Sequence, residues 1–79
     1  MKFNVYKMYS DYTRASIGTY PDASAGRTAA LENMEDSAND LHEAFGARIL
    51  NMDKSNFTLC FVTVNGRYRT YWWGMQAID

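Results

Sequence analysis

The chain is poor in the residues that form covalent and catalytic frameworks. Its 79 residues include one cysteine, one histidine and one proline. Cys60 has no partner for an intrachain disulfide. Because extracellular domains of this size usually need disulfide bonds, a reducing cytoplasm is the expected compartment.

Long hydrophobic runs are also missing. No segment approaches the roughly 20 apolar residues that span a bilayer, and residues 1–12 lack the continuous apolar core of a signal peptide. We therefore expect no membrane partner. The composition, 47% hydrophobic and 22% charged, is that of a globular protein. A chain this short is expected to form a single compact domain over residues 1–79, with one small core.

Sequence signatures of catalysis and metal binding are equally sparse. His42 has no second nitrogen ligand near it, and the chain has no phosphate-binding glycine loop, hydrolase elbow or zinc-ligand spacing. Cys60 has no basic neighbour in the sequence that would activate a thiol. The expectation is a non-enzyme with no catalytic residue, no metal site and no cofactor.

Two hydrophobic periodicities divide the chain. A period of two over residues 3–9 and 13–20 predicts two strands joined by a turn at 10–12. The period then changes to that of a helix from Ala23 to Phe45, with Asp22 or Ser24 as its N-cap and Gly46 as its end. One apolar stripe follows the helical spacing: Leu31, Met34, Ala38, Leu41 and Phe45.

The segment from residue 56 to 75 contains two alternating runs around Asn65-Gly66. This dipeptide favours a two-residue type I′ hairpin turn, which fixes the strand register. In that register Leu59 faces Trp72, and Trp72 joins the core. The other face of the hairpin then combines cations with large aromatic rings, namely Arg67, Arg69, Tyr71 and Trp73.

These elements predict an α+β fold in the order β-β-α-β-β, a four-stranded antiparallel sheet with one helix packed on one face. Residues 47–55 are expected to be a connection. The helix stripe should pack against a set of sheet residues: Phe3, Val5, Phe57, Leu59, Phe61 and Trp72. Since one helix covers only one face of a sheet, the other face is expected to be open for interaction.

The net charge of −1 conceals a strong segregation. Residues 28–47 carry five acidic side chains and no lysine or arginine, whereas each flanking segment carries four basic and two acidic side chains. Four carboxylates lie opposite the apolar stripe: Glu32, Asp36, Asp40 and Glu43. Like charges at i, i+4 cost about 0.2–0.5 kcal/mol per pair. The row is either a solvating surface or a nucleic-acid mimic that binds a basic groove.

The hairpin face has several interpretations. Arg67 and Arg69 could bind phosphates while Tyr71 or Trp73 stacks on an unpaired base. The same residue types dominate protein–protein hot spots. A third possibility is burial against residues 47–55 or against a homodimer copy.

In length, in its short sheet with one helix and in its segregated charge, the chain resembles small proteins encoded by phages and mobile elements, the anti-CRISPR inhibitors among them. The resemblance implies a non-enzymatic inhibitor in the host cytoplasm, acting as a monomer or homodimer. Its partner would be a host protein or ribonucleoprotein complex of nucleic-acid-guided defence, blocked at a nucleic-acid channel or subunit interface. The alternative is a small module that binds RNA or single-stranded DNA on the basic and aromatic sheet face.

Overall fold

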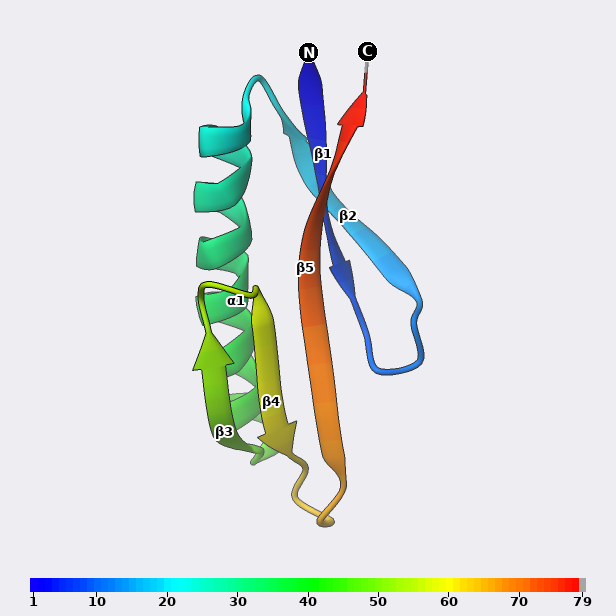
Figure 1. Ribbon diagram of the computed structural model, residues 1–79. Coiled ribbons are helices and arrows are strands. Elements are labelled where there is room, and N and C mark those ends of the chain that lie inside the picture. Colours follow the sequence, from blue (N-terminus) through cyan, green and yellow to red (C-terminus); the bar gives the residue numbers. More distant parts are fainter. Residues whose placement is uncertain (79) are drawn as a thin grey trace.

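A computed structural model describes residues 1–78 and shows a five-stranded antiparallel sheet with one helix along one face (Figure 1). The elements are β1 (Lys2–Met8), β2 (Arg14–Tyr20), α1 (Ala23–Phe45), β3 (Arg48–Asp53), β4 (Thr58–Val62) and β5 (Tyr68–Ile78). The sheet order is β2-β1-β5-β4-β3, which pairs the first and last strands. The α+β class with a single helix is confirmed, whereas the prediction of four strands is wrong.

The strand that the sequence pattern misses is β3, which lies where a connection is expected. Ile49 pairs with Phe61 and Met52 pairs with Leu59, and a register shift between Ile49 and Asn51 marks a bulge at Leu50. A bulge breaks the alternation of side chains along a strand. The period of two that identifies strands is therefore absent from this segment.

The helix begins and ends where the sequence predicts, because both ends carry specific capping residues. The Asp22 carboxylate accepts a hydrogen bond of 2.8 Å from the Ala25 backbone N–H. Gly46 takes the left-handed conformation with φ of 68°, and the Ala47 N–H donates to the Leu41 carbonyl at 2.9 Å. The Gly46 N–H donates to the same carbonyl, and the left-handed residue turns the chain so that both bonds can form at the end of the helix.

Gly26 allows α1 to approach the sheet closely. A Cβ atom at this position would lie 2.7 Å from the sulfur of Met75 and 3.3 Å from a methyl group of Val5. Both neighbours belong to the central strand pair, in which Val5 lies opposite Met75. The missing side chain thus brings the first turns of the helix against the middle of the sheet.

The turn between β4 and β5 has three loop residues rather than two. Thr63 N–H donates to the Arg67 carbonyl at 2.8 Å, and Gly66 N–H donates to the Thr63 carbonyl at 2.9 Å. Gly66 has a φ of 85°, while Asn65 is not among the residues with positive φ. A type I′ turn needs positive φ at both of its central residues, so the structure has instead the three-residue turn that ends in a left-handed glycine.

This turn shifts β5 by one residue and reverses its faces relative to the prediction. Leu59 pairs with Tyr71 and Phe61 pairs with Arg69. Trp73 is therefore on the helix side with only 5% of its surface exposed, and Trp72 is on the open side. The assignment of Trp72 to the core and of Trp73 to the open face is wrong. The assignment of Leu59 and Phe61 to the core is confirmed.

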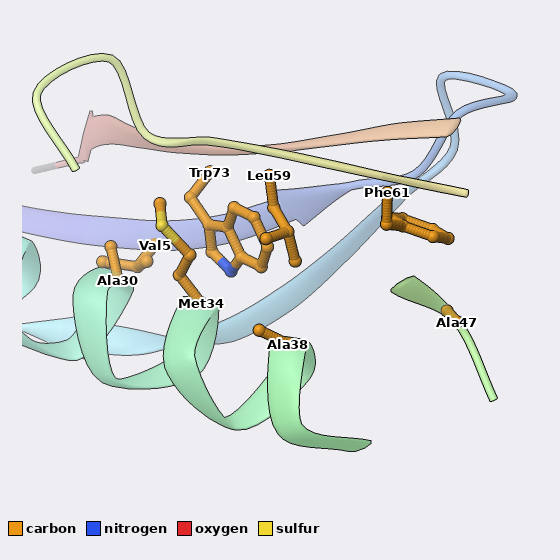
Figure 2. Close-up of a cluster of buried hydrophobic side chains, with 8 residues drawn as sticks. All are labelled: Val5, Ala30, Met34, Ala38, Ala47, Leu59, Phe61 and Trp73. Carbon is orange, nitrogen blue, oxygen red and sulfur yellow. The ribbon is translucent and has the colours of Figure 1, made fainter. Parts of the chain in front are cut away.

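The core lies between α1 and the sheet, and Figure 2 shows its buried side chains. They are Val5, Ala30, Met34, Ala38, Ala47, Leu59, Phe61 and Trp73. The Trp73 indole N–H donates to the side-chain oxygen of Asn33 at 2.8 Å, which satisfies the polar atom of the ring. Phe45, expected in the core, is 68% exposed because it lies on the rim of a groove beside the last helical turn.

The two adjacent tryptophans provide a test of the register. We expect Trp73→Phe to lower the free energy of unfolding by about 1.5–3 kcal/mol, since it removes buried ring atoms and the hydrogen bond to Asn33. Trp72→Phe, on the open face, should cost less than about 1 kcal/mol. Urea unfolding followed by circular dichroism measures both variants. The reverse order would contradict the three-residue turn.

Candidate binding surfaces

The single histidine and cysteine both make local contacts. The Nδ1 atom of His42 lies 3.1 Å from the Ala47 carbonyl oxygen, beside the end of α1. The sulfur of Cys60 lies 3.5 Å from the hydroxyl oxygen of Thr70 across the β4–β5 pair. Within residues 1–78, no group of three or more His, Cys, Asp or Glu side chains is arranged to hold a metal ion. Both contacts are to neutral groups, a backbone carbonyl and a hydroxyl.

The outward side of α1 is an acidic face, formed by Glu32, Asp36, Asp40 and Glu43, all of which are exposed. The neighbouring Glu35 pairs with Lys54 at 2.7 Å, with each side chain at least half exposed. A pair this exposed contributes at most about 1 kcal/mol. It is the one ion pair within residues 1–78, so the acidic face keeps its negative charge.

Lys7 lies beside the acidic face, between α1 and the sheet. Its ammonium donates to the Ser37 hydroxyl at 2.9 Å and lies 5.0, 4.7 and 5.6 Å from three ring centroids. The rings are those of Tyr9, Tyr71 and Trp73. Burial lowers the pKa of Lys7 below 10.5, and the negative charge of Asp40 acts in the opposite direction. The lysine thus links the helix to the aromatic side chains of the sheet.

An open groove of about 680 Å³ lies at the end of the molecule opposite the chain termini (Figure 1). Its walls are the β1–β2 loop, the last turns of α1 and the turn between β4 and β5. Phe61, Arg69 and Tyr71 line it from the sheet. The Tyr71 ring contacts Phe61 edge to face, with centroids 4.9 Å apart at 75°. We call this region the end groove.

Polar groups also converge on the end groove. Burial raises the pKa of the Tyr71 hydroxyl above 10.0; Tyr9 and Asp11 add to this effect, whereas the positive charge of Arg69 opposes it. The Asp11 carboxylate accepts hydrogen bonds from the Thr13 backbone and hydroxyl at 3.1 and 2.7 Å. These bonds lower the pKa of Asp11, so this wall carries a negative charge at neutral pH. The groove thus combines an apolar lining with one cation and one anion.

The open side of the sheet carries a different set of aromatic side chains. Tyr12 has a φ of 68°, a left-handed conformation that is uncommon for a large residue. Its ring stacks on Trp72 with centroids 5.9 Å apart and 14° between the planes, and 71% of Tyr12 is exposed. The β1–β2 loop therefore holds a flat aromatic surface over the middle of the sheet.

A second stacked pair lies on the same side. The Arg14 guanidinium is 4.5 Å from the centroid of the Tyr6 ring. Tyr6 pairs with Gly74, and a Cβ atom there would lie within 3.0 Å of the tyrosine ring. Glycine at this position lets the Tyr6 ring lie flat across β5. We call the region formed by Tyr6, Tyr12, Arg14 and Trp72 the aromatic face.

The structure divides the eight residues that the sequence nominates for binding. Glu32, Asp36, Asp40 and Glu43 share the exposed side of α1, as expected from their spacing. Arg69 and Tyr71 lie together in the end groove instead of on the open face. Arg67 is exposed at the hairpin turn, and Trp73 is a core residue. The predicted hairpin surface of Arg67, Arg69, Tyr71 and Trp73 therefore does not exist as one surface.

The sequence pattern does not predict the aromatic face, because this face depends on the reversed register of β5. A signal for the correct register is nevertheless present in the sequence of β5. Tyr71, Trp73 and Met75 form an apolar series, whereas the alternate positions include Thr70, Gly74 and Gln76. An alternation followed over the whole strand would have placed the first series on the core side.

Comparisons of the chain with protein-family models, with curated proteins and with solved structures found no match. Among residues 1–78, α1 is the only helix, and it is too polar to cross a bilayer.

The burial of Lys7 predicts a lowered pKa and a contribution to stability that depends on pH. An NMR titration should place its pKa below 10.5, and Asp40→Asn should lower the pKa further, because the aspartate charge favours the ammonium form. Between the lowered pKa and 10.5 the unfolded chain binds more protons, so Lys7 makes stability rise with pH in that window. Asp36→Asn is the matched control, with a smaller expected effect. A pKa at 10.5 in the wild-type protein would contradict the burial of Lys7.

Proposed function

We propose that this chain is a non-enzymatic inhibitor that binds a nucleic-acid-guided host defence complex through the acidic face of α1. The observation that supports the proposal is the exposed row of Glu32, Asp36, Asp40 and Glu43, which has no ion-pair partner among residues 1–78. A helix selected for stability alone gains from mixed charges at i, i+4. This helix instead keeps like charges together.

The density of the acidic face suits a site that normally holds nucleic acid. Four carboxylates from residue 32 to residue 43 extend over about 16 Å of helix axis, so that neighbouring charges are on average about 5.5 Å apart along it. One strand of duplex DNA carries one charge per roughly 3.4 Å of axis. A basic channel would thus meet roughly 60% of the linear charge of a DNA strand, held on a rigid helix. The inhibitor would act stoichiometrically, by occupying the channel or an adjoining subunit interface.

The rigidity of α1 supports this role. The helix is fixed at both ends by its caps and along its length by the packing of Met34 and Ala38 against the sheet. Electrostatic complementarity mainly raises the association rate and the specificity of such complexes, and it weakens with salt. The proposal therefore includes binding that is fast at low ionic strength and slower at high ionic strength.

The acidic face can be tested with a charge-neutralising variant. Pull-down from bacterial lysates followed by mass spectrometry should recover a guided nuclease or one of its subunits, and equimolar protein should block target cleavage by the purified complex. We expect Asp36→Asn with Glu43→Gln to weaken inhibition by about tenfold or more, with a circular dichroism spectrum like that of the wild type.

A control variant with the same change in net charge tests whether the loss of inhibition depends on the acidic face itself. Thr19→Lys with Gln76→Lys also raises the net charge by two, but on exposed residues of β2 and β5. This variant should inhibit as the wild-type protein does. An equal loss of inhibition in both double variants would show that the net charge of the protein matters and the position of the charges does not. Full inhibition by Asp36→Asn with Glu43→Gln would refute the role of the acidic face.

The aromatic face supports a second candidate, a module that binds RNA or single-stranded DNA. Aromatic rings on an open sheet are a common platform for unpaired bases, with each stack contributing about 1–3 kcal/mol. The pair of Tyr12 and Trp72 offers such a platform, and Arg14 supplies a cation beside it. The residues differ from those predicted from the sequence, but the chemistry is the same.

Fluorescence anisotropy of labelled 12-nucleotide dT and rU oligomers tests this candidate at low and high salt. Binding should decrease with salt and should be abolished by Tyr12→Ala with Trp72→Ala. Phe45→Ala, which removes an exposed aromatic ring at the end groove, should leave binding unchanged. If neither oligomer changes its anisotropy at low salt, the aromatic face does not bind single strands.

A further inference from the structure

The end groove has features that neither the acidic face nor the aromatic face explains. Its volume of about 680 Å³ falls within the range of about 300–1,000 Å³ typical of ligand sites. Two large apolar residues contribute to its rim, Phe45 from α1 and Val64 from the hairpin turn, with 68% and 82% of their surfaces exposed. A small protein gains nothing in stability from apolar side chains held in water.

Arg69 places a cation inside this apolar groove. It pairs with Phe61 across the sheet, and its guanidinium donates one hydrogen bond of 3.2 Å to the Tyr68 carbonyl. A guanidinium carries five N–H donors, and Arg69 has no carboxylate within ion-pair distance among residues 1–78. Several donors are therefore free to bind a carboxylate, for which the planar fork of arginine is well suited.

The opposite wall offers the complementary group. Asp11 lies in the β1–β2 loop and is ionised at neutral pH. The Thr13 bonds engage only Oδ1 of its carboxylate, so the second oxygen can accept a further hydrogen bond. An occupant that suits the groove thus has an apolar group for Phe45 and Val64, a carboxylate for Arg69 and an N–H donor for Asp11.

We propose that the end groove binds a segment of another protein in which an aromatic or aliphatic side chain stands next to a carboxylate. A polypeptide supplies all three features at once, because its backbone N–H groups accompany the side chains. The groove is open rather than enclosed, which allows a chain to enter and leave it. Binding in the end groove does not depend on the proposed function, because none of the four residues of the acidic face lines the groove.

The test uses the full chain and a short peptide as a probe. The probe is the capped hexapeptide Ac-Gly-Ala-Phe-Asp-Ala-Gly-NH₂, and its binding is followed by NMR shifts of the ¹⁵N-labelled protein. We expect saturable shifts at Phe45, Val64, Arg69 and Tyr71. Replacing the aspartate of the peptide by asparagine, or its phenylalanine by alanine, should weaken binding about tenfold, a loss of about 1.4 kcal/mol.

The hairpin provides a matched pair of protein variants. Arg69→Gln should weaken the aspartate peptide about tenfold and abolish its preference over the asparagine peptide. Arg67→Gln removes the same charge two residues away, outside the groove, and should change neither. Both variants are checked for folding by their NMR spectra, and Val64→Ser supplies a second groove variant that keeps Arg69.

Three results would overturn the proposal. The first is the absence of saturable shifts in the groove, or shifts confined to the aromatic face. The second is equal affinity of Arg69→Gln and Arg67→Gln for the aspartate peptide. The third is binding of free phenylacetate as tight as that of the peptide, which would assign the groove to a small aromatic acid instead of a protein segment. None of these results bears on inhibition through the acidic face.

Discussion

The register of β5 is the constraint on which the rest of the structure depends. The three-residue turn at residues 64–66 sets it, because Gly66 takes the left-handed conformation that closes the turn. Since β5 pairs with β1 on one side and β4 on the other, its register determines which side chains meet the helix. Trp73 then reaches Asn33, and Tyr71 meets Phe61. A shift of one residue would exchange every one of these contacts.

That register also separates the three surfaces of the molecule. The acidic side chains of α1 are exposed, with Asp36 and Asp40 at its edge beside β1 and β2. The aromatic rings of Tyr12 and Trp72 lie on the open face of the sheet. The segregation of charge along the chain becomes a segregation between layers. The end groove lies where the helix stops and the hairpin continues, so residues of both layers line it. A domain of this size can therefore present distinct chemistries without mixing them.

The parts of the fold that are local in sequence could be predicted, and the parts that depend on pairing could not. The helix bounds follow from Asp22 and Gly46, which act within one turn of the residues they cap. The hairpin register depends on whether both Asn65 and Gly66 adopt positive φ or Gly66 alone does, and both turns accept the same dipeptide. The bulge at Leu50 hides β3 for a similar reason, because it removes the alternation that marks a strand.

The candidate sites follow the same division. The exposure of the acidic row was predictable from helical spacing alone. The meeting of Arg69, Tyr71 and Asp11 in one groove was not, because it requires the register of β5 and the path of the β1–β2 loop together. Sequence spacing identifies residues that share a face of one element. It does not reveal a site assembled from three.

The central pairing of β1 with β5 has a consequence for how the chain folds. Each of the hairpins β1–β2, β3–β4 and β4–β5 joins strands that are neighbours in sequence, but the β1–β5 pair brings Lys2 opposite Ile78. Contacts between residues so distant in sequence form slowly, because a long loop must close before they stabilise anything. During synthesis β1 cannot pair with β5 until β5 has been made. Until then the β1–β2 and β3–β4 hairpins expose unpaired strand edges, which can pair with the edges of other chains.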